Sequence, residues 1–458
     1  MSADLAALAP FHLIHVGGIG MSALARILVA DGIPVSGSDP KETGQTIALR
    51  ALGVPVAIPG DVAAIPAGAT IVVSSATRPD NPELIAARER GLVVLHRSQL
   101  LALLVRGHPT IAVSGTHGKT TTTAMIVHIL RTAGLDPTFI VGSELVDPAT
   151  NAQRGSGDWS IVEADESDGS LLSLAPDVAV LTNLEPEHLD HYAGIEELTE
   201  TMRAWIAGVQ PDGCVVACVD DPGARAVIDG ARTPTRTYGF DAGDARLVRI
   251  DGTTVLELDG SAHRLELAAP GAHNARNAAA AVLAAQQAGV DPASAVRALA
   301  TFTGTRRRFE AKGTTGSIRI IDDYAHHPTE IAATLQAARD VTRERGRIIA
   351  LFEPHLYSRT MHLGADMGAA LAHGADLVAI LPIDGSREAD VPSVTSRIVL
   401  DGALAAEPRR IVAWCANRDD AVRWVMRHAD DDDLILTIGA GGITTLGPEL
   451  LSELEKRR

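Results

Sequence analysis

Short apolar runs alternate with helical segments in the first part of the chain. Phe11–Val16, Pro34–Ser38 and Thr70–Ser74 have the β-branched, apolar character of buried strands, and residues 21–30 have the apolar face of a helix. Strands that alternate with helices in this way predict a parallel sheet with right-handed crossover connections.

The most informative pattern begins at residue 110. Thr110–Ser114 predicts a buried strand, a glycine loop follows, and Ala124–Leu130 has a helical apolar face. A strand, a glycine loop and a helix together bind phosphate, because backbone N–H groups and the helix dipole face the anion. The loop is shorter than a standard P-loop, with Gly115 and Gly118 as its hinges. A plain glycine turn would not need the adjoining lysine and threonines, so we interpret the segment as a nucleoside triphosphate site.

The later parts of the chain continue the pattern. Residues 235–267 show the alternation and Asp-Gly pairs of antiparallel hairpins, and a helix is expected over 273–288. Polar breaks at 106–109 and 304–308 divide the chain into predicted domains 1–107, 108–309 and 310–458. Further strands are predicted at 177–182, 213–219, 318–322, 348–352, 377–381 and 434–438. The predicted fold class is α/β: a Rossmann-like N-terminal domain, a central P-loop-type domain with a parallel sheet and small antiparallel hairpins, and a Rossmann-like C-terminal domain.

Composition narrows the function classes. The 458 residues are 46% hydrophobic and 21% charged, as expected of two or three globular domains. The net charge of −17 argues against a nucleic-acid surface, which needs clustered lysine and arginine. The three cysteines form no disulfide framework, and Cys214 and Cys218 are expected in the core. No apolar stretch reaches bilayer length, so we expect a soluble, cytoplasmic protein without a membrane partner.

The N-terminal glycine loop is a second candidate for a diphosphate site. Gly17, Gly18 and Gly20 leave backbone N–H groups accessible at a helix start, but His15 stands where the dinucleotide fingerprint has its first glycine. Asp39 ends the next predicted strand, where a ribose-binding acid would lie. A structural glycine turn is nearly as well supported by this loop alone.

Carboxylates follow two strands of the predicted central domain. Glu163–Asp168 comes after the apolar run 159–162, and Asn183–Tyr192 comes after the strand at 177–182. A solvated charge cluster is one interpretation of the first segment. Carboxylates at the carboxyl edge of a parallel sheet are also well placed to hold Mg²⁺ beside a phosphate loop. His188 would be an unusual ligand for magnesium.

Polar clusters mark the remaining candidate sites. His273, Asn274 and Asn277 share one side of a helix start and could cap it or face an adenine edge. Asp322–Pro328 and Glu353–Arg359 each follow a strand of the third domain, and their arginine and tyrosine side chains suit the carboxylate of a small zwitterion.

Together these segments resemble the Mur ligase family, and within it the branch that adds L-alanine. They occur in the family's order over essentially the whole chain. The matching segments are Gly17–Ser22, Gly115–Thr123, Glu163–Asp168, Asn183–Tyr192, Gly271–Asn274 with Asn277, Arg307–Glu310, Asp322–Glu330 and Glu353–Thr360.

The resemblance implies a domain for the UDP-sugar, a central ATPase domain and a domain for the amino acid. The implied reaction joins L-alanine to the lactyl carboxylate of UDP-N-acetylmuramate in peptidoglycan precursor synthesis. ATP would phosphorylate the carboxylate, and the amine would displace phosphate from the acyl phosphate. The implied partners are these small molecules with ATP and two Mg²⁺ ions, and the chain would be a monomer or a weak dimer.

Roles carried over from the family fall on matching positions of this chain. Thr120 and Glu166 would hold one Mg²⁺ and His188 the second, although Glu163 is an open alternative to Glu166. The residues implied for catalysis are Lys119, Thr120, Glu166, His188 and His326. Those implied for ATP are Gly115, Thr116, His117, Gly118, Lys119, Thr120, Thr121, His273, Asn274, Asn277, Arg308 and Asp323. Those implied for the UDP-sugar are Gly17, Gly18, Ile19, Gly20, Met21, Ser22, Asp39 and His191. Tyr324, His326 and Arg359 are implied for L-alanine.

The chain departs from the family pattern at four places: His15, Glu187 where aspartate is common, Leu356 where some relatives have arginine, and Gly169–Leu171. Within the same chemistry, a ligase for a recycled tripeptide is the nearest alternative. Folylpolyglutamate synthase would not need the N-terminal diphosphate loop, and a nicotinamide dehydrogenase would not need the second phosphate site. A non-catalytic UDP-sugar sensor would not need Lys119 beside a metal cluster.

Overall fold

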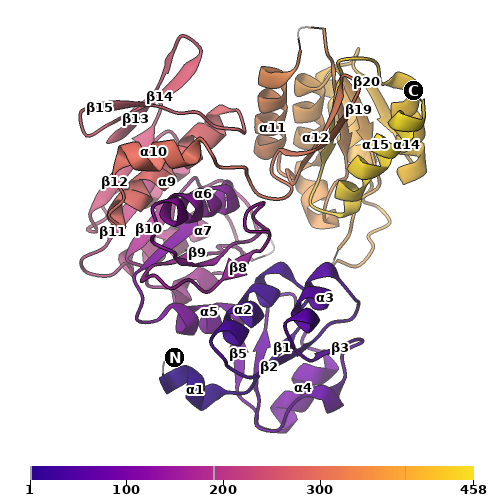
Figure 1. Ribbon diagram of the computed structural model, residues 1–458. Helices are drawn as coiled ribbons and strands as arrows, with labels where there is room; N and C mark the ends of the chain where they lie inside the picture. The colour runs from indigo at the N-terminus through magenta and orange to yellow at the C-terminus, as the bar shows by residue number, and fades with distance from the viewer. Residues whose placement is uncertain (1–2, 189–190, 344, 387, 458) are drawn as a thin grey trace. The chain divides into compact units, whose positions relative to one another are not determined.

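The computed structural model describes residues 3–188, 191–343, 345–386 and 388–457 (Figure 1). The chain forms two compact units, the first made of Met1–Leu267 with Ala275–Thr303 and the second of Ala268–Asn274 with Gly304–Arg458. The first unit contains two β-sheets and the second contains one, so each predicted domain has a sheet. The predicted boundaries at 107/108 and 309/310 fall between the sheets and stay predictions.

The first sheet has the strand order β3-β2-β1-β4-β5, and every neighbouring pair is parallel. This confirms the parallel sheet predicted from alternating strands and helices. Its strands are β1 (Phe11–Ile14), β2 (Val35–Ser38), β3 (Val56–Ala57), β4 (Thr70–Val73) and β5 (Val94–His96). Its helices are α1 (Ala3–Leu8), α2 (Ile19–Ala30), α3 (Gly44–Ala51), η1 (Val62–Ala64), α4 (Pro82–Glu89) and α5 (Arg97–Val105).

The second sheet has ten strands in the order β15-β14-β13-β12-β11-β10-β6-β9-β7-β8. The strands from β12 to β7 in this order pair in parallel, and β6 lies between β10 and β9. Its strands are β6 (Thr110–Ser114), β7 (Thr138–Ile140), β8 (Ala152–Gln153), β9 (Ser160–Glu163), β10 (Val178–Leu181), β11 (Cys214–Cys218), β12 (Thr235–Gly239), β13 (Ala245–Ile250), β14 (Thr253–Leu258) and β15 (Ser261–Arg264). Its helices are α6 (Lys119–Thr132), η2 (Ser170–Ser173), α7 (Ile195–Ala207), α8 (Pro222–Ile228), α9 (Ala272–Gln287) and α10 (Pro292–Leu299).

Two expectations for this sheet can be compared with the structure. The antiparallel hairpins begin only at β13, because β12 pairs in parallel with both β11 and β13. The start predicted at residue 235 was therefore about ten residues too early. Cys214 and Cys218 are buried in β11, as expected of core residues.

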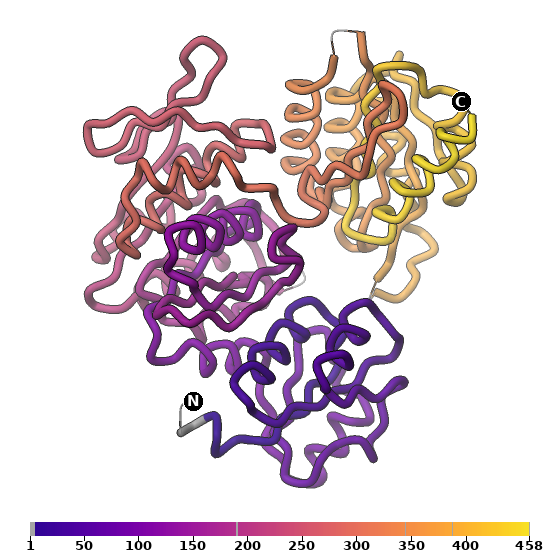
Figure 2. The backbone as a smooth tube through the Cα atoms, in the orientation of Figure 1, coloured from indigo at the N-terminus to yellow at the C-terminus, as the bar shows by residue number. Residues whose placement is uncertain are grey.

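The third sheet has the order β16-β17-β21-β18-β19-β20 and is parallel except for the antiparallel pair β16–β17. Edge strands β16 and β20 were not predicted from the sequence. The strands are β16 (Glu310–Thr315), β17 (Ile318–Asp323), β18 (Ile348–Phe352), β19 (Leu377–Ile380), β20 (Ile411–Trp414) and β21 (Leu434–Ile438). The helices are α11 (Pro328–Val341), α12 (Tyr357–Gly374), α13 (Arg397–Ala406), α14 (Arg418–His428), η3 (Gly442–Thr445) and α15 (Leu446–Arg457). Figure 2 follows the backbone through all three sheets in chain order.

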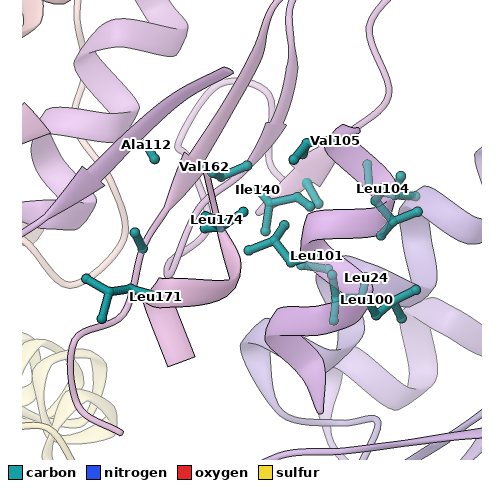
Figure 3. Close-up of a cluster of buried hydrophobic side chains, with 14 of the residues drawn as sticks. Leu24, Leu100, Leu101, Leu104, Val105, Ala112, Ile140, Val162, Leu171 and Leu174 are labelled. Atoms are coloured by element: carbon teal, nitrogen blue, oxygen red, sulfur yellow. The ribbon is translucent and has the colours of Figure 1, made fainter. Parts of the chain in front are cut away.

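One apolar core joins the first two sheets. Helix α5 contributes Leu100, Leu101 and Leu104, which are buried with Leu24 of α2 and with Ile140 of β7 (Figure 3). Burial of leucine side chains is worth roughly 1.5–3 kcal/mol each, so this shared core holds the first domain against the second. Among the described residues, none of the helices combines the length and apolarity that a membrane-spanning helix requires.

Candidate functional site

The phosphate loop lies where the sequence predicted it, between β6 and α6. Ser114 ends the strand and Lys119 begins the helix. Gly115 and Gly118 have φ angles of +128° and +81°, which side chains with a Cβ rarely adopt. The two glycines therefore turn the chain sharply enough to leave the first N–H groups of α6 at the loop, where an anion is favoured.

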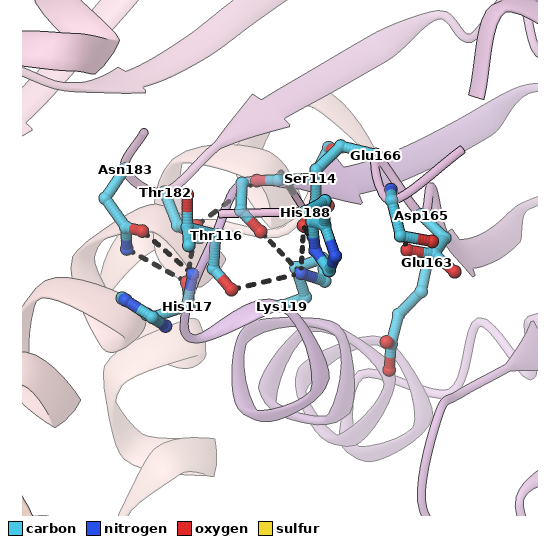
Figure 4. A network of polar contacts seen from close by, with 12 residues as sticks. Ser114, Thr116, His117, Lys119, Glu163, Asp165, Glu166, Thr182, Asn183 and His188 are labelled. Carbon is cyan, nitrogen blue, oxygen red and sulfur yellow. Dashed lines mark hydrogen bonds and ion pairs between the residues drawn. The ribbon is translucent and has the colours of Figure 1, made fainter. Parts of the chain in front are cut away.

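Residues that follow the neighbouring strand β10 fix the conformation of this loop through hydrogen bonds. Asn183 accepts a hydrogen bond from His117 N at 2.8 Å and donates one to His117 O at 2.9 Å (Figure 4). Thr182 Oγ1 also donates to His117 O, at 2.6 Å. Thr116 Oγ1 accepts from Glu185 N at 2.9 Å. Thr182 was not predicted as a site residue, and Asn183 was singled out only as the first residue of the segment Asn183–Tyr192, without a role of its own; the position of both after a central parallel strand could have indicated one.

Asn277 of α9 contacts the end of the loop. A Cβ placed on Gly118 would lie 2.6 Å from Asn277 Oδ1, so the backbone and this amide are in close approach. The contact brings the predicted adenine-facing residue Asn277 to the phosphate loop. Thr121, also predicted for ATP, lies in the first turn of α6.

Replacing Gly118 by alanine is expected to weaken nucleotide binding by at least about tenfold, because the new methyl group displaces Asn277 and strains the loop. The matched control is Gly134→Ala, which has a φ of +79° and nothing within 4 Å of its Cβ. Both variants should lose about 1–2 kcal/mol of unfolding free energy for the left-handed conformation. Urea unfolding and titration with an ATP analogue measure the two effects. Wild-type nucleotide affinity in Gly118→Ala would contradict the proposed contact.

Lys119 lies in a buried polar network with Glu166 and His188 (Figure 4). Its Nζ donates to Gly115 O at 2.6 Å, to Thr116 O at 3.1 Å and to Glu166 Oε1 at 2.8 Å. His188 Nε2 is 3.3 Å from the same carboxylate oxygen. Glu166 is fully buried, and its Oε2 has no hydrogen-bond partner among the described residues. An unsatisfied buried carboxylate oxygen is suited to a cation.

The electrostatic environment keeps Lys119 and Asp165 in their charged forms. Burial alone would lower the pKa of Lys119, but the nearby carboxylates of Glu166, Asp165 and Glu163 outweigh burial and raise the pKa above its ordinary value. Burial alone would raise the pKa of Asp165, but Arg97, Lys119 and hydrogen bonds with Ser167 lower it to about 2. Both groups are therefore charged at neutral pH.

Thr120 contacts Glu163 rather than Glu166. Its Oγ1 donates to Glu163 Oε2 at 3.3 Å, and Glu163 is the last residue of β9, paired with Val113 of β6. The family pattern joined Thr120 with Glu166 and left Glu163 as an alternative. In the structure the carboxylates form two separate pairs: Thr120 with Glu163, and Glu166 with His188. Carboxylate and hydroxyl oxygens are the ligands that Mg²⁺ prefers, so Thr120, Glu163 and the unsatisfied Oε2 of Glu166 fit magnesium, whereas the imidazole of His188 is a less usual ligand.

The N-terminal glycine loop connects β1 with α2. Asp39 Oδ2 accepts a hydrogen bond from Gly17 N at 2.9 Å, and a Cβ on Gly17 would lie 2.7 Å from that oxygen. His15 has a φ of +60°, the left-handed conformation that glycine would adopt without strain. The loop thus makes a tight turn despite His15. Gly18, Ile19 and Gly20 follow at the start of α2, with Met21 and Ser22 buried in its first turns.

His191 was predicted for the UDP-sugar, and it lies after β10 rather than in the N-terminal loop. It is exposed, and its ring packs edge-on against Tyr192 with the centroids 4.7 Å apart. A Cβ on Gly169 would be 3.6 Å from His191 Nε2, so His191 lies beside the segment that follows Glu163–Asp168. Residues 189 and 190 of the same motif lie outside the described residues.

The predicted amino-acid residues gather at the carboxyl ends of β17 and β18 in the second unit. The rings of Tyr324 and His326 are 5.4 Å apart, and His326 is 6.4 Å from His355. Arg359 Nη1 is 3.4 Å from His355 O. The guanidinium group of Arg308 lies 5.0 Å from the Tyr324 ring centroid. The structure therefore brings together Tyr324, His326 and Arg359, as the sequence predicted from matching strand ends.

Asp323 and Asn274, both predicted for ATP, form hydrogen bonds with neighbouring parts of the chain. Asp323 is buried and accepts hydrogen bonds from Phe309 N, Ala325 N and Thr334 Oγ1 at 2.8, 2.9 and 3.0 Å. Burial raises the pKa of Asp323, against the effect of Arg308 and these hydrogen bonds. Asn274 Nδ2 donates to Pro270 O at 2.9 Å, which ties the first turn of α9, next to His273, to the segment that precedes the helix.

Comparison with known proteins agrees with this geometry. Three family models match consecutive parts of the chain: "Mur ligase family, catalytic domain" over residues 10–109, "Mur ligase middle domain" over 113–285, and "Mur ligase, glutamate ligase domain" over 307–441. The chain belongs to the Mur ligase family. Members of this family are ATP-dependent.

Two relatives of this Mur ligase are UDP-N-acetylmuramate–L-alanine ligases. The protein from Paenarthrobacter aurescens is 44% identical over 99% of this chain and 98% of its own. The protein from Kineococcus radiotolerans is 45% identical over the same shares. Among solved structures, UDP-N-acetylmuramate-alanine ligase from Thermotoga maritima has a TM-score of 0.82 and 26% identity, with 98% of this chain and 99% of that chain covered. The predicted three-domain α/β fold is thereby confirmed.

Proposed function

We propose that this Mur ligase joins L-alanine to the lactyl carboxylate of UDP-N-acetylmuramate, with cleavage of ATP, in peptidoglycan precursor synthesis. The observation that carries the proposal is the phosphate loop, where Lys119 and Thr120 each contact a carboxylate of the Glu163–Asp168 segment. The names of the full-length relatives support the choice of substrates.

The chemistry requires an activated carboxylate, because oxide is too poor a leaving group for direct attack by an amine. A lactyl carboxylate oxygen attacks the γ-phosphorus of ATP, the bond to the β-phosphate oxygen breaks, and ADP leaves. The amine nitrogen of L-alanine then attacks the acyl carbon, loses a proton, and displaces phosphate as the amide forms. Phosphoryl transfer depends mainly on positioning and charge neutralisation. Lys119 and the loop N–H groups supply both.

We propose that Thr120 and Glu163 hold one Mg²⁺ and that Glu166 and His188 hold the second. Bound magnesium would neutralise charge on the phosphate oxygens during transfer. Lys119 lies 2.8 Å from Glu166 in the structure, and it is the group that would turn toward the γ-phosphate. His326 is proposed to lie near the reacting amine.

The remaining roles follow the family pattern. For ATP, we propose that Asn277, Asn274 and His273 face adenine, that Asp323 reaches the ribose, and that Arg308 lies near the phosphates. The loop Gly17–Ser22 with Asp39 is proposed for the UDP-sugar diphosphate, and His191 for the sugar side. A cytoplasmic location, a monomer or weak dimer, and the lack of nucleic-acid and membrane partners stay predictions.

Arg359 is the proposed anchor of the L-alanine carboxylate, and Tyr324 is proposed to contact L-alanine as well. Replacing Arg359 by glutamine is expected to raise the KM for L-alanine about 10- to 100-fold, since hydrogen bonds to charged groups contribute about 1.5–3 kcal/mol. The KM values for ATP and UDP-N-acetylmuramate should stay within about threefold of wild type. Initial rates with each substrate varied in turn measure this. An equal rise in all three constants would contradict a specific role for Arg359.

Phosphate release from Mg-ATP with UDP-N-acetylmuramate tests the proposed function when only the amine is varied. The amines are L-alanine, glycine, L-serine, D-glutamate and the tripeptide L-alanyl-γ-D-glutamyl-meso-diaminopimelate. We expect release that depends on both the sugar nucleotide and L-alanine. Phosphate release with the tripeptide alone would indicate a ligase for the recycled tripeptide. No phosphate release with any of the amines would overturn the proposal.

A further inference from the structure

The carboxylates of the acidic segment Glu163–Asp168 contact two different parts of the protein. Glu163 and Glu166 accept hydrogen bonds from Thr120 and Lys119 of the phosphate loop. The two aspartates of the segment, Asp165 and Asp168, instead contact residues of the N-terminal domain. Carboxylates from one short segment thus touch both the ATP site and the proposed sugar-nucleotide domain.

Asp165 is paired with Arg97, the first residue of α5. Arg97 Nη2 donates to Asp165 Oδ2 at 2.6 Å, and the Arg97 side chain is only 23% exposed. Asp165 Oδ1 accepts from Ser167 N at 3.1 Å, which fixes the turn between the two aspartates. A short, partly buried ion pair of this kind holds its geometry better than a pair in open solvent.

Asp168 meets the ends of two strands of the first sheet. Its Oδ2 accepts a hydrogen bond from Ser75, which follows β4, and lies 3.6 Å from Nε2 of His96, the last residue of β5. Its Oδ1 accepts from Ser170 N at 3.0 Å. Open α/β sheets bind their ligands at the carboxyl ends of the strands, which is where Ser75 and His96 lie.

We propose that Asp165 and Asp168 are positioning residues that couple sugar-nucleotide binding to ATP binding. This inference rests on the proposed function. A sugar nucleotide at the carboxyl edge of the first sheet shifts Ser75, His96 or Arg97, and the aspartates carry that shift to Glu166 and Lys119. Coupling is reciprocal, so ATP raises the affinity for the sugar nucleotide by the same factor.

A second set of contacts between the same domains offers a matched control. Arg154, which follows β8, donates through Nε to Asp31 Oδ1 at 2.7 Å, and Asp31 caps the carboxyl end of α2. This ion pair also crosses between the domains, but it involves neither the acidic segment nor the phosphate loop. Its removal should loosen the interface without breaking the proposed coupling.

Calorimetric titration with UDP-N-acetylmuramate, with and without a non-hydrolysable ATP analogue and Mg²⁺, measures the coupling factor. In wild type we expect roughly 5- to 150-fold tighter binding with the analogue present. Asp165→Asn and Asp168→Ala should bring the factor to within about twofold of one, and Arg154→Gln should keep the wild-type factor. Ser75→Ala, a milder change on the opposite side of the contact, should also lower it, and it replaces Asp168→Ala if that variant does not fold.

Three outcomes would overturn the inference: independent binding of the two ligands to wild type, an unchanged factor in the aspartate variants, or an equal loss in Arg154→Gln. Failure of the proposed function is distinguishable from all three. In that case wild type would bind no sugar nucleotide or no analogue, or it would bind both and release phosphate only when the tripeptide is the amine.

Discussion

Replacing Lys119 by methionine is expected to lower the ligation rate by about 10²- to 10³-fold or more, the usual effect of removing one charge-stabilising group from a transition state. The ammonium group is the cation that the loop itself offers to the phosphate being transferred. Its raised pKa keeps it protonated over the whole neutral range, so the loss should be equally large at pH 6 and pH 9. Initial rates at saturating substrates measure the effect.

The structure adds a stability effect to this substitution. Glu166 is fully buried, and Lys119 is its ion-pair partner at 2.8 Å. Removing one partner of a buried pair costs about 3–5 kcal/mol, because the remaining charge is uncompensated. The double variant Lys119→Met, Glu166→Gln should therefore recover melting temperature but not ligation. A double variant that ligates at the wild-type rate would contradict the assignment of the phosphate loop.

The second large effect is expected at Glu163. Glu163→Gln should raise the Mg²⁺ concentration for half-maximal activity at least about tenfold, because a neutral amide replaces a carboxylate beside Thr120. The control is Arg154→Gln, whose ion pair with Asp31 lies outside the acidic segment and the phosphate loop and which should leave the magnesium requirement unchanged. Initial rates measured over a range of Mg²⁺ concentrations, with the substrates fixed, give the requirement of each variant. If Glu163→Gln has the wild-type magnesium requirement and Glu166→Gln has a higher one, the carboxylate that holds Mg²⁺ with Thr120 would be Glu166 and not Glu163.

The sequence predicted the local parts of this site well because the signals are local. Thr110–Ser114 is a strand with the predicted bounds, and the helix begins at the lysine of the glycine loop. Apolar periodicity and glycine spacing depend on neighbours along the chain, so one sequence contains them. The polar ends of β17 and β18 were predicted on the same basis.

The partners of the carboxylates depend on strand order, which periodicity does not contain. Glu163 lies beside Thr120 because β9 is the neighbour of β6, and Asn183 braces the loop because β10 is the other neighbour. The division of the acidic segment between the phosphate loop and the N-terminal domain arises from the same tertiary arrangement. Spacing along the chain cannot distinguish Glu163 from Glu166.

The missed strands have a similar cause. β16 reads Glu-Ala-Lys-Gly-Thr-Thr and is stabilised by pairing with β17, not by an apolar pattern. β20 is an edge strand whose Ile411 and Trp414 are exposed, so it also lacks the signature of a buried strand. β12 was assigned to the antiparallel hairpins because alternation does not reveal the direction of pairing.

Transfer of oxygen from the substrate carboxylate to phosphate tests the central claim most directly. UDP-N-acetylmuramate labelled with ¹⁸O in its lactyl carboxylate is incubated with Mg-ATP, L-alanine and the protein, and the released phosphate is analysed by mass spectrometry. We predict one ¹⁸O atom in each phosphate and one new amide bond for each ATP cleaved. Unlabelled phosphate, or phosphate released without the sugar nucleotide, would contradict the activation of this carboxylate at the loop of Lys119.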